Sequence, residues 1–287
     1  MSREIFTVNL YNYLNDPKSY ICKKYQDHNR KLIESYTSDT VEYKLVDITD
    51  EQEKFLKENT GLYELSPKHK FQMISDFVRY EYLKNNPGSI FIDTDFVIFG
   101  DRGLDVLTVD RSVSLKYKKD FTAGEMGRHG QHSCNWLMIS GGGGDNSLSS
   151  QLSKLLVERS SHESIENWKS NNKKFGVYED SNLSKYAPIP KGDYTELESD
   201  DSYERRMVFD LFWGYKLYEF INPNEYRQIP YYQWQCSYWD GDWRDTNVID
   251  KDHILGCHFF GFAKGRPTIS EFLEYHKLDD KYNDLSE

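Results

Sequence analysis

The chain has 287 residues, enough for one large domain or two small ones and for a substantial hydrophobic core. Its 36 Lys and Arg against 47 Asp and Glu give a net charge of −11, which argues against a protein that mainly neutralises nucleic acid or anionic lipid. We therefore expect no nucleic-acid partner. Its 22 Tyr, 16 Phe and 6 Trp make the chain unusually aromatic, which argues against an intrinsically disordered protein.

The sequence carries no recognisable targeting segment. Glu4 and Asn9 interrupt the region in which a secretory signal needs an unbroken apolar stretch, and no apolar run is long enough to span a membrane. The four cysteines lie far apart and form no Cys-x-x-Cys pair, which indicates free thiols in a reducing compartment. We expect a cytoplasmic protein without a permanent membrane anchor.

Strands and helices alternate along the first hundred residues. Helix starts are marked by Pro17, by a Thr49-x-x-Gln52 capping box and by Ser66-Pro67. Apolar or β-rich runs between these helices predict strands at residues 5–10, at 41–46 and from residue 89 onward. This alternation predicts an α/β fold with a central, mostly parallel sheet flanked by helices.

The second half is less regular. We expect a strand at 135–140, a glycine run at 141–144, a helix at 147–158, a long loop at 170–201 and a helix at 203–220. No internal repeat is present. We expect a single domain over 1–287, divided into halves at 1–145 and 146–287.

Asp93 and Asp95 are the sharpest chemical signal, because they lie one residue apart inside the apolar run 90–99. Two buried like charges are costly unless they have a cation, a shared proton or a strand end open to solvent. Mg²⁺ or Mn²⁺ would satisfy this condition and would also hold a diphosphate. A simple Asp-Thr-Asp turn at a strand end is the alternative.

Asp76 and Arg79 lie three residues apart on the predicted third helix and share one face. An ordinary surface salt bridge is the alternative for such a pair. However, the pair immediately precedes the strand that carries Asp93, and ligands of open α/β sheets gather at the carboxyl ends of strands. We therefore expect this helix face to meet the same site.

His258, Gly261 and Lys264 form a third group near the end of the chain. They would supply an imidazole for a metal, a backbone that allows close approach, and an ammonium for phosphate oxygens. A buried core histidine is the alternative for His258, and His253 competes for the same role.

These segments resemble a known family. Residues 75–79 and 90–95 are similar to the S-D-x-x-R and D-x-D motifs of sugar-nucleotide glycosyltransferases with the GT-A fold, a group that includes capsular, mannosyl and clostridial toxin transferases. Residues 133–139 resemble the strand that lines the donor-sugar pocket of that family. Residues 258–264 resemble the His-x-x-Gly-x-x-Lys segment of glycogenin-like retaining transferases.

The resemblance implies a metal-dependent enzyme that moves a sugar from a nucleoside-diphosphate sugar to a glycan or other acceptor, with retention of configuration and a role in polysaccharide biosynthesis. UDP, the commonest nucleotide in those families, is the expected carrier. Residues 1–145 would bind the nucleotide sugar and residues 146–287 the acceptor.

The resemblance also implies a role for each matching residue. Asp93 is shared between the metal and the ribose, Asn135 faces the sugar, and Lys264 neutralises the leaving diphosphate. The implied ligands of Mn²⁺ or Mg²⁺ are Asp93, Asp95 and His258. The implied catalytic residues are Asp76, Arg79, Asn135 and Lys264. Beside Asp93, the expected nucleotide contacts are Asn9 and Tyr11, at the end of the first strand.

The acceptor and the stereochemistry leave alternatives open. If the enzyme inverts, Asp145, Asp242 and Asp245 are equal candidates for the base. Aromatic rings at 213, 234, 239 and 243 form either an acceptor-sugar platform or part of the core.

Two other functions compete with the transferase. In a haloacid dehalogenase-type phosphohydrolase, Asp93 would be the nucleophile and Asp95 the general acid/base. That family's motif normally ends the first strand, whereas here two strand–helix units precede it. A glycan- or nucleotide-binding module without turnover is the other competitor, and the retained carboxylate pair argues against it.

Overall fold

The structure is a computed structural model, and it describes residues 3–9, 17–36, 41–109, 120–123, 136–141, 145, 147–171, 203–204, 207–208, 211–212, 226–229, 234–236, 255–258 and 269–275. Its strands are β1 (Arg3–Val8), β2 (Val41–Val46), β3 (Ile90–Ile92), β4 (Phe96–Ile98), β5 (Asp120–Ala123), β6 (Leu137–Ile139), β7 (Tyr226–Ile229), β8 (Trp234–Cys236) and β9 (Gly256–His258). Its helices are α1 (Pro17–Ser35), α2 (Asp50–Asn59), η1 (Leu62–Glu64), α3 (Pro67–Asn85), α4 (Gly100–Val109), α6 (Leu148–Arg159), α7 (His162–Asn171) and α10 (Ile269–Tyr275).

The strands form two sheets. The larger has six strands in the order β2-β1-β3-β6-β5-β7, and the smaller has three in the order β4-β9-β8. In the larger sheet β1 pairs in parallel with β2 and β3, and β5 pairs in parallel with β7. Strand β6 runs antiparallel to both of its neighbours. The α/β fold with a mostly parallel, helix-flanked sheet is therefore confirmed.

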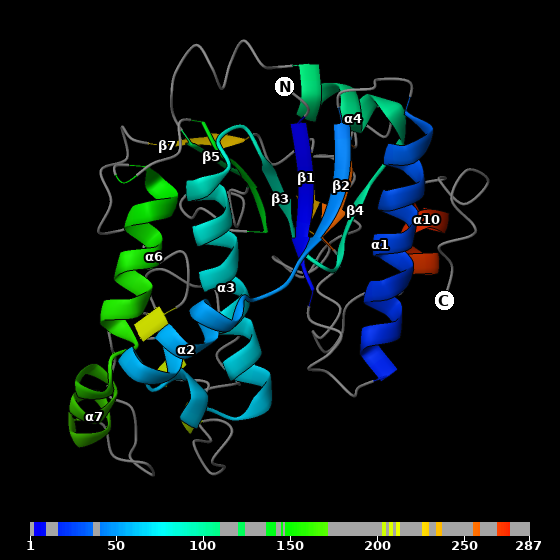
Figure 1. Cartoon of the computed structure of the whole chain (residues 1–287). Helices are drawn as coiled ribbons and strands as arrows, with labels where there is room; N and C mark the ends of the chain where they lie inside the picture. The colour runs from blue at the N-terminus through cyan, green and yellow to red at the C-terminus, as the bar shows by residue number, and fades with distance from the viewer. Residues whose placement is uncertain are drawn as a thin grey trace.

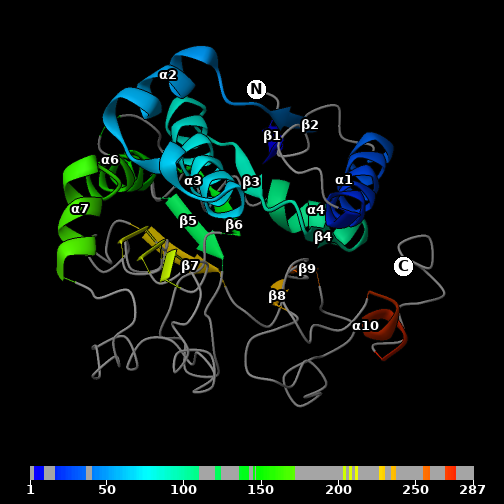
Figure 2. The same cartoon turned by 90° about the horizontal axis from the view of Figure 1, so that it is seen from below.

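Helices cover both faces of the larger sheet (Figure 1). On one side Phe6, Phe91 and Met138 pack against α3 and α6, while on the other Ile5 and Ile90 pack toward α1 and α4. Successive residues of a strand point to opposite faces, so each strand supplies both cores in turn. Figure 2 shows the layers from below, with α2, α3, α6 and α7 on one side of the strands and α1 and α4 on the other.

Local signals in the sequence placed several boundaries well. The predicted strand at 41–46 is β2, and the predicted capping box is formed, with Gln52 N–H donating to Thr49 Oγ1 at 3.2 Å and Thr49 N–H donating to Gln52 Oε1 at 3.0 Å. Ser147 caps α6 through a bond from Ser150 N–H. Helices α4 and α7 were not predicted. The expected loop at 170–201 begins later, because α7 continues to Asn171; the rest of that loop lies outside the described residues.

Strands from both halves of the chain contribute to both sheets. Strand β7 extends the larger sheet beside β5, and β9 pairs antiparallel with β4. The helix predicted at 203–220 is described only at three short helical stretches, 203–204, 207–208 and 211–212. No helix among the described residues is long and apolar enough to cross a membrane.

Gly103 allows α4 to approach the strand segment that leads into β9. A Cβ at this position would lie 2.6 Å from the carbonyl oxygen of Leu255 and 2.7 Å from Ile98 Cγ2. The first of these neighbours is backbone, so a side-chain rotation cannot relieve the clash. The absence of a side chain therefore sets the distance between α4 and the small sheet.

We predict that Gly103→Ala destabilises the protein by about 1–3 kcal/mol, because the backbone around Leu255 has to shift. Urea unfolding measures the change. Lys31→Ala, at an exposed site on α1, is the control and should alter stability by less than about 0.5 kcal/mol. Equal stabilities for the two variants would contradict the close packing of α4.

Candidate active site

The segment Asp93-Thr94-Asp95 joins the two sheets. The apolar run at 90–99 is not continuous strand: β3 ends at Ile92 in the larger sheet and β4 begins at Phe96 in the smaller one, so Asp93 and Asp95 lie in a turn at a strand end, the arrangement that the sequence analysis gave as an alternative. Phe96 N–H donates to the carbonyl of Asp93 at 3.1 Å, which closes a tight turn. Both carboxylates therefore lie at the carboxyl end of β3, where ligands of α/β sheets are commonly bound.

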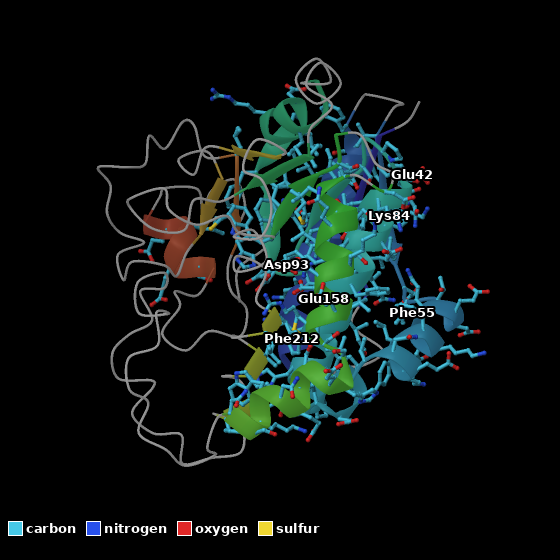
Figure 3. The ribbon with its side chains drawn as sticks, turned by 90° about the vertical axis from the view of Figure 1, so that its left-hand side faces the viewer. Glu42, Phe55, Lys84, Asp93, Glu158 and Phe212 are labelled. Carbon is cyan, nitrogen blue, oxygen red and sulfur yellow. The ribbon has the colours of Figure 1, made fainter. Side chains whose placement is uncertain are left out.

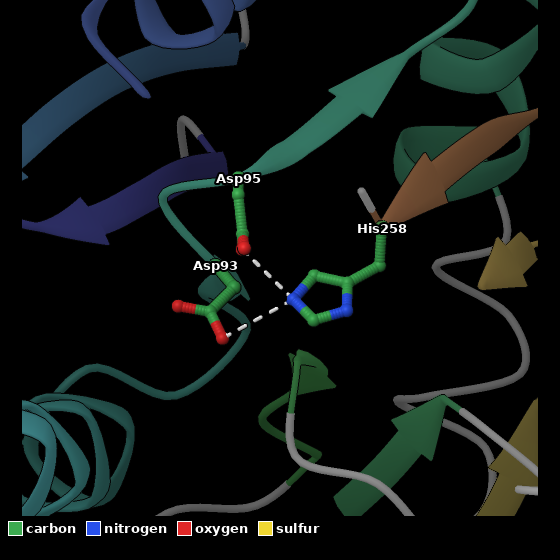
Figure 4. A group of neighbouring side chains, drawn as sticks. All are labelled: Asp93, Asp95 and His258. Atoms are coloured by element: carbon green, nitrogen blue, oxygen red, sulfur yellow. Dashed lines mark ion pairs between the residues drawn. The ribbon is translucent and has the colours of Figure 1, made fainter. Parts of the chain in front are cut away.

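His258 reaches this turn through strand pairing. Its register partner in β4 is Phe96, the residue that follows Asp95. The imidazole Nε2 lies 2.8 Å from Asp95 Oδ1 and 3.6 Å from Asp93 Oδ2. Dashed lines in Figure 4 mark these two ion pairs. His258 and Asp95 are 4% and 6% exposed. The pairing of β4 with β9 thus brings together three residues that the sequence analysis had grouped only by resemblance.

The donor set fits a hard divalent cation. One ligand atom from each of Asp93, Asp95 and His258 lies within 4.8 Å of the others, and among the described residues no other group of three His, Cys, Asp or Glu comes together in this way. Carboxylate oxygens are the ligands of Mg²⁺ and Mn²⁺, and the imidazole nitrogen makes Mn²⁺ the better match. The side chains present therefore suit the metal that the sequence analysis expected.

Asp93 is held in its ionised form. Burial raises the pKa of this carboxyl, but the Arg79 guanidinium, the His258 imidazole and the Thr94 backbone amide together hold the pKa below its usual value. The Thr94 N–H donates to Asp93 Oδ1 at 3.0 Å. Asp93 is therefore available as an anionic ligand throughout the neutral and mildly acidic pH range.

Asp76 and Arg79 form a buried ion pair on α3. Arg79 Nη2 lies 2.7 Å from Asp76 Oδ1, and the two residues are 4% and 6% exposed, respectively. The guanidinium also packs over the ring of Phe91 in β3, with 4.2 Å between Cζ and the ring centroid. The alternative of a surface salt bridge is thus excluded, and the Arg79 guanidinium lies close enough to the turn to lower the pKa of Asp93.

Asn29 is a positioning residue that the sequence analysis missed. Its side-chain Nδ2 donates to the carbonyl of Phe96 at 2.8 Å, and its Oδ1 accepts from Ile98 N–H at 2.9 Å. It therefore binds the edge of β4 away from β9 as a neighbouring strand would. A usable signal was present, because Asn29 lies four residues from both Tyr25 and Ile33 on the buried stripe of α1.

Asn9 directly follows β1, at the strand end where it was predicted to lie. Its backbone N–H donates to the carbonyl of Val46, just beyond the ends of β1 and β2. Because β1 and β3 are parallel, Asn9 and Asp93 follow neighbouring strand ends. In Figure 3 Asp93 lies toward the small sheet, whereas the exposed ring of Phe55 lies at the opposite side of the molecule.

Several predicted positions fall outside the described residues. They include two of the four implied catalytic residues, one nucleotide contact and most of the aromatic platform. Asp145, a candidate base, is described and highly exposed. The predicted positions outside the described residues are Tyr11, Asn135, Gly142–Gly144, Trp213, Trp239, Asp242, Trp243, Asp245, His253, Gly261 and Lys264.

Comparison with known proteins gives no family assignment. No protein-family model matches the sequence, and no curated protein matches it.

Several solved glycosyltransferases show a distant structural similarity. GlyE of Streptococcus pneumoniae has 11% identity and a TM-score of 0.40; the match covers 96% of this chain, which spans only 60% of GlyE. A glycosyltransferase involved in glycosylation of the PBCV-1 major capsid has 10% identity and a TM-score of 0.40, over 96% of this chain and 100% of that one. The galactosyltransferase LgtC, solved with donor and acceptor sugar analogs, has 9% identity and a TM-score of 0.39, over 96% and 95% of the two chains. Such scores are too low to assign an activity, so the site's own chemistry has to carry the function.

We predict that Asn29→Leu destabilises the protein by about 2–4 kcal/mol, because it removes the buried hydrogen bonds to the Phe96 carbonyl and from the Ile98 N–H. Chemical denaturation measures the loss. Asn59→Leu is the matched control: Asn59 also bonds a backbone carbonyl, that of Phe55 at 2.8 Å, but at an exposed position. If both substitutions cost the same, Asn29 does not hold β4 in place.

Proposed function

We propose that the protein is a GT-A type, metal-dependent glycosyltransferase that moves a sugar from a nucleoside-diphosphate sugar, UDP-sugar being the expected donor, to a glycan or other acceptor. The observation that carries this proposal is the convergence of Asp93, Asp95 and His258 at the carboxyl end of β3. The order of the motifs along the chain supports it, since the Asp76–Arg79 pair, the Asp-x-Asp turn and the late histidine resemble one family.

The charges of the site explain why a nucleoside diphosphate suits it. Two carboxylates repel an anionic diphosphate unless a cation lies between them. A divalent ion bound there would supply that positive charge and would stabilise the negative charge that develops on the leaving diphosphate. Asp93, Asp95 and His258 would hold it, and their donor atoms are already together in the protein.

Arg79 contributes a positive charge that is fixed before substrate binds. Its ion pair with Asp76 and its packing on Phe91 restrict the guanidinium. A charge that does not need to reorganise stabilises a transition state more effectively than a mobile one. We propose that Asp76 and Arg79 act on the donor sugar or its phosphates from the α3 side of the turn.

The remaining roles follow from the family resemblance. We propose that Asn135 faces the donor sugar, that Lys264 neutralises the leaving diphosphate, and that Asn9 and Tyr11 contact the base. The chain would form one domain, with residues 1–145 binding the nucleotide sugar and residues 146–287 binding the acceptor. Breakage of the sugar–phosphate bond needs no protein nucleophile in this scheme.

We predict that Mn²⁺ together with the correct nucleoside diphosphate raises the midpoint of thermal unfolding by several degrees, since a ligand at about 100 times its Kd adds roughly 2.7 kcal/mol. A panel of nucleoside diphosphates, with and without Mn²⁺, also identifies the base. Asp95→Asn should abolish the metal-dependent part of the shift. Asp101→Asn, which alters an exposed carboxylate on α4, should leave it unchanged.

The same experiment separates the competing functions. A phosphohydrolase would show no shift with any nucleotide and would hydrolyse a generic phosphate ester in Mg²⁺, with loss of activity in Asp93→Asn. A binding module would show the nucleotide shift without release of nucleoside diphosphate from any donor and acceptor.

We also predict that transfer retains the anomeric configuration of the donor sugar, in accordance with the glycogenin-like segment at 258–264. A proton NMR spectrum of the product formed at early times reports the configuration through the coupling constant of the anomeric proton. An inverted product would contradict retention and would require a catalytic base, which the retaining scheme does not use.

A further inference from the structure

Trp136 contacts both segments that carry the proposed metal ligands. Its carbonyl accepts the N–H of Asp93 at 2.8 Å, and its indole is parallel to the imidazole of His258, with 5.5 Å between centroids and 5° between planes. The indole also stacks against Phe96, the register partner of His258, at 5.4 Å. One residue therefore touches the end of the larger sheet and the histidine of the smaller one.

The orientation of an imidazole needs such a contact. The second side-chain torsion of histidine is broad, so the backbone of β9 alone does not determine where Nε2 points. A flat ring that lies parallel to the imidazole and offset from it restricts rotation about that torsion, because turning the imidazole would bring its edge toward the indole. With the ring in this plane, Nε2 faces Asp95 Oδ1 at 2.8 Å and Asp93 Oδ2 at 3.6 Å.

Simple core filling does not account well for a tryptophan here. Trp136 is 3% exposed, and its Nε1 has no hydrogen-bond acceptor among the residues that the structure describes. A buried donor without an acceptor costs about 1–3 kcal/mol, which a phenylalanine at the same position would avoid. The contacts with His258 and Phe96 are made by the ring faces, and the N–H group takes no part in them.

We propose that Trp136 is a positioning residue, which holds the His258 imidazole so that Nε2 faces the two carboxylates and the three donors are arranged for a divalent cation before it binds. The claim that this orientation prepares the three donors for a cation rests on the function proposed above. The claim that Trp136 fixes the orientation of the His258 ring is independent of that function.

The test compares three variants with the wild-type protein. Trp136→Leu removes the flat face, Trp136→Phe keeps a smaller one, and Trp168→Leu is the matched control. Trp168 is also buried, at 8% exposure, but it lies on α7 in the other core cluster and meets Tyr203 edge-on. Each protein is examined by thermal unfolding, by Mn²⁺ titration with electron paramagnetic resonance, and by NMR of the histidine ring carbons and protons.

We predict that Trp136→Leu lowers Mn²⁺ affinity by about 10–100-fold, the usual effect of removing a group that orients a metal ligand. Trp136→Phe should stay within about threefold of wild type, because it retains a ring face. Trp168→Leu should lower the unfolding midpoint without changing Mn²⁺ affinity. The ring-current shift of the His258 signals, assigned by their absence in His258→Gln, should disappear in Trp136→Leu and remain in Trp168→Leu.

A folded Trp136→Leu variant with wild-type Mn²⁺ affinity would overturn the positioning role. Should that variant not fold, Trp136→Met replaces it, since methionine fills much of the volume without a flat face. A wild-type protein that does not bind Mn²⁺ would instead refute the proposed metal dependence. The NMR comparison would then still decide whether Trp136 fixes the imidazole.

Discussion

Two ionised carboxylates separated by one residue repel each other, and burial strengthens the repulsion because protein is less polarisable than water. Residues around Asp93 and Asp95 reduce this repulsion by placing cationic or polar groups beside the two carboxylates. Arg79 lies on the α3 side of the turn, and His258 lies beside both carboxylates from β9. Helix α3, the turn between β3 and β4, and strand β9 all contribute residues to the surroundings of the two carboxylates. The fold is therefore arranged around the charge as much as around the two hydrophobic cores.

The two sheets meet this constraint by different means. The larger sheet supplies the strand end that exposes Asp93, and its own strands are fixed by apolar side chains that alternate between two cores. The smaller sheet is short, and its outer edge is bound by polar groups of α1. Asn29 replaces a missing strand there, and His28 Nε2 lies 3.1 Å from the carbonyl of Ile98. Apolar packing of the larger sheet therefore positions Asp93, whereas hydrogen bonds between α1 and β4 position the smaller sheet, which carries His258.

The sequence was sufficient for what depends on neighbouring residues. The Thr49–Gln52 capping box and the helix start at Pro67 were visible because their partners lie within one turn. The association of Asp76 with Arg79 followed from helical spacing. In contrast, a turn at Asp93-Thr94-Asp95 was only an alternative, and the assignment of β3 and β4 to different sheets was not predicted, because both strands are apolar and only the choice of partner strand separates them. Helical spacing could have indicated that Asn29 is buried, but the partners of Asn29 and Trp136 lie far away in the chain, so spacing could not identify them. The convergence of His258 on the two aspartates came from family resemblance and is explained physically only by the β4–β9 register.

The position of the Asp-Thr-Asp turn between two sheets has a mechanical consequence. Asp93 directly follows β3 of the larger sheet and Asp95 directly precedes β4 of the smaller one, so a change in the angle between the sheets would alter the positions of the donor atoms relative to one another. A ligand bound by all three donors would connect the two sheets at the Asp93-Thr94-Asp95 turn and would restrict their relative motion. Conversely, a change in the angle between the sheets would move the donor atoms apart and weaken binding of that ligand. A substitution at Gly103, where α4 contacts the segment that leads into β9, would thus change the geometry of the Asp93, Asp95 and His258 side chains without a direct contact to them.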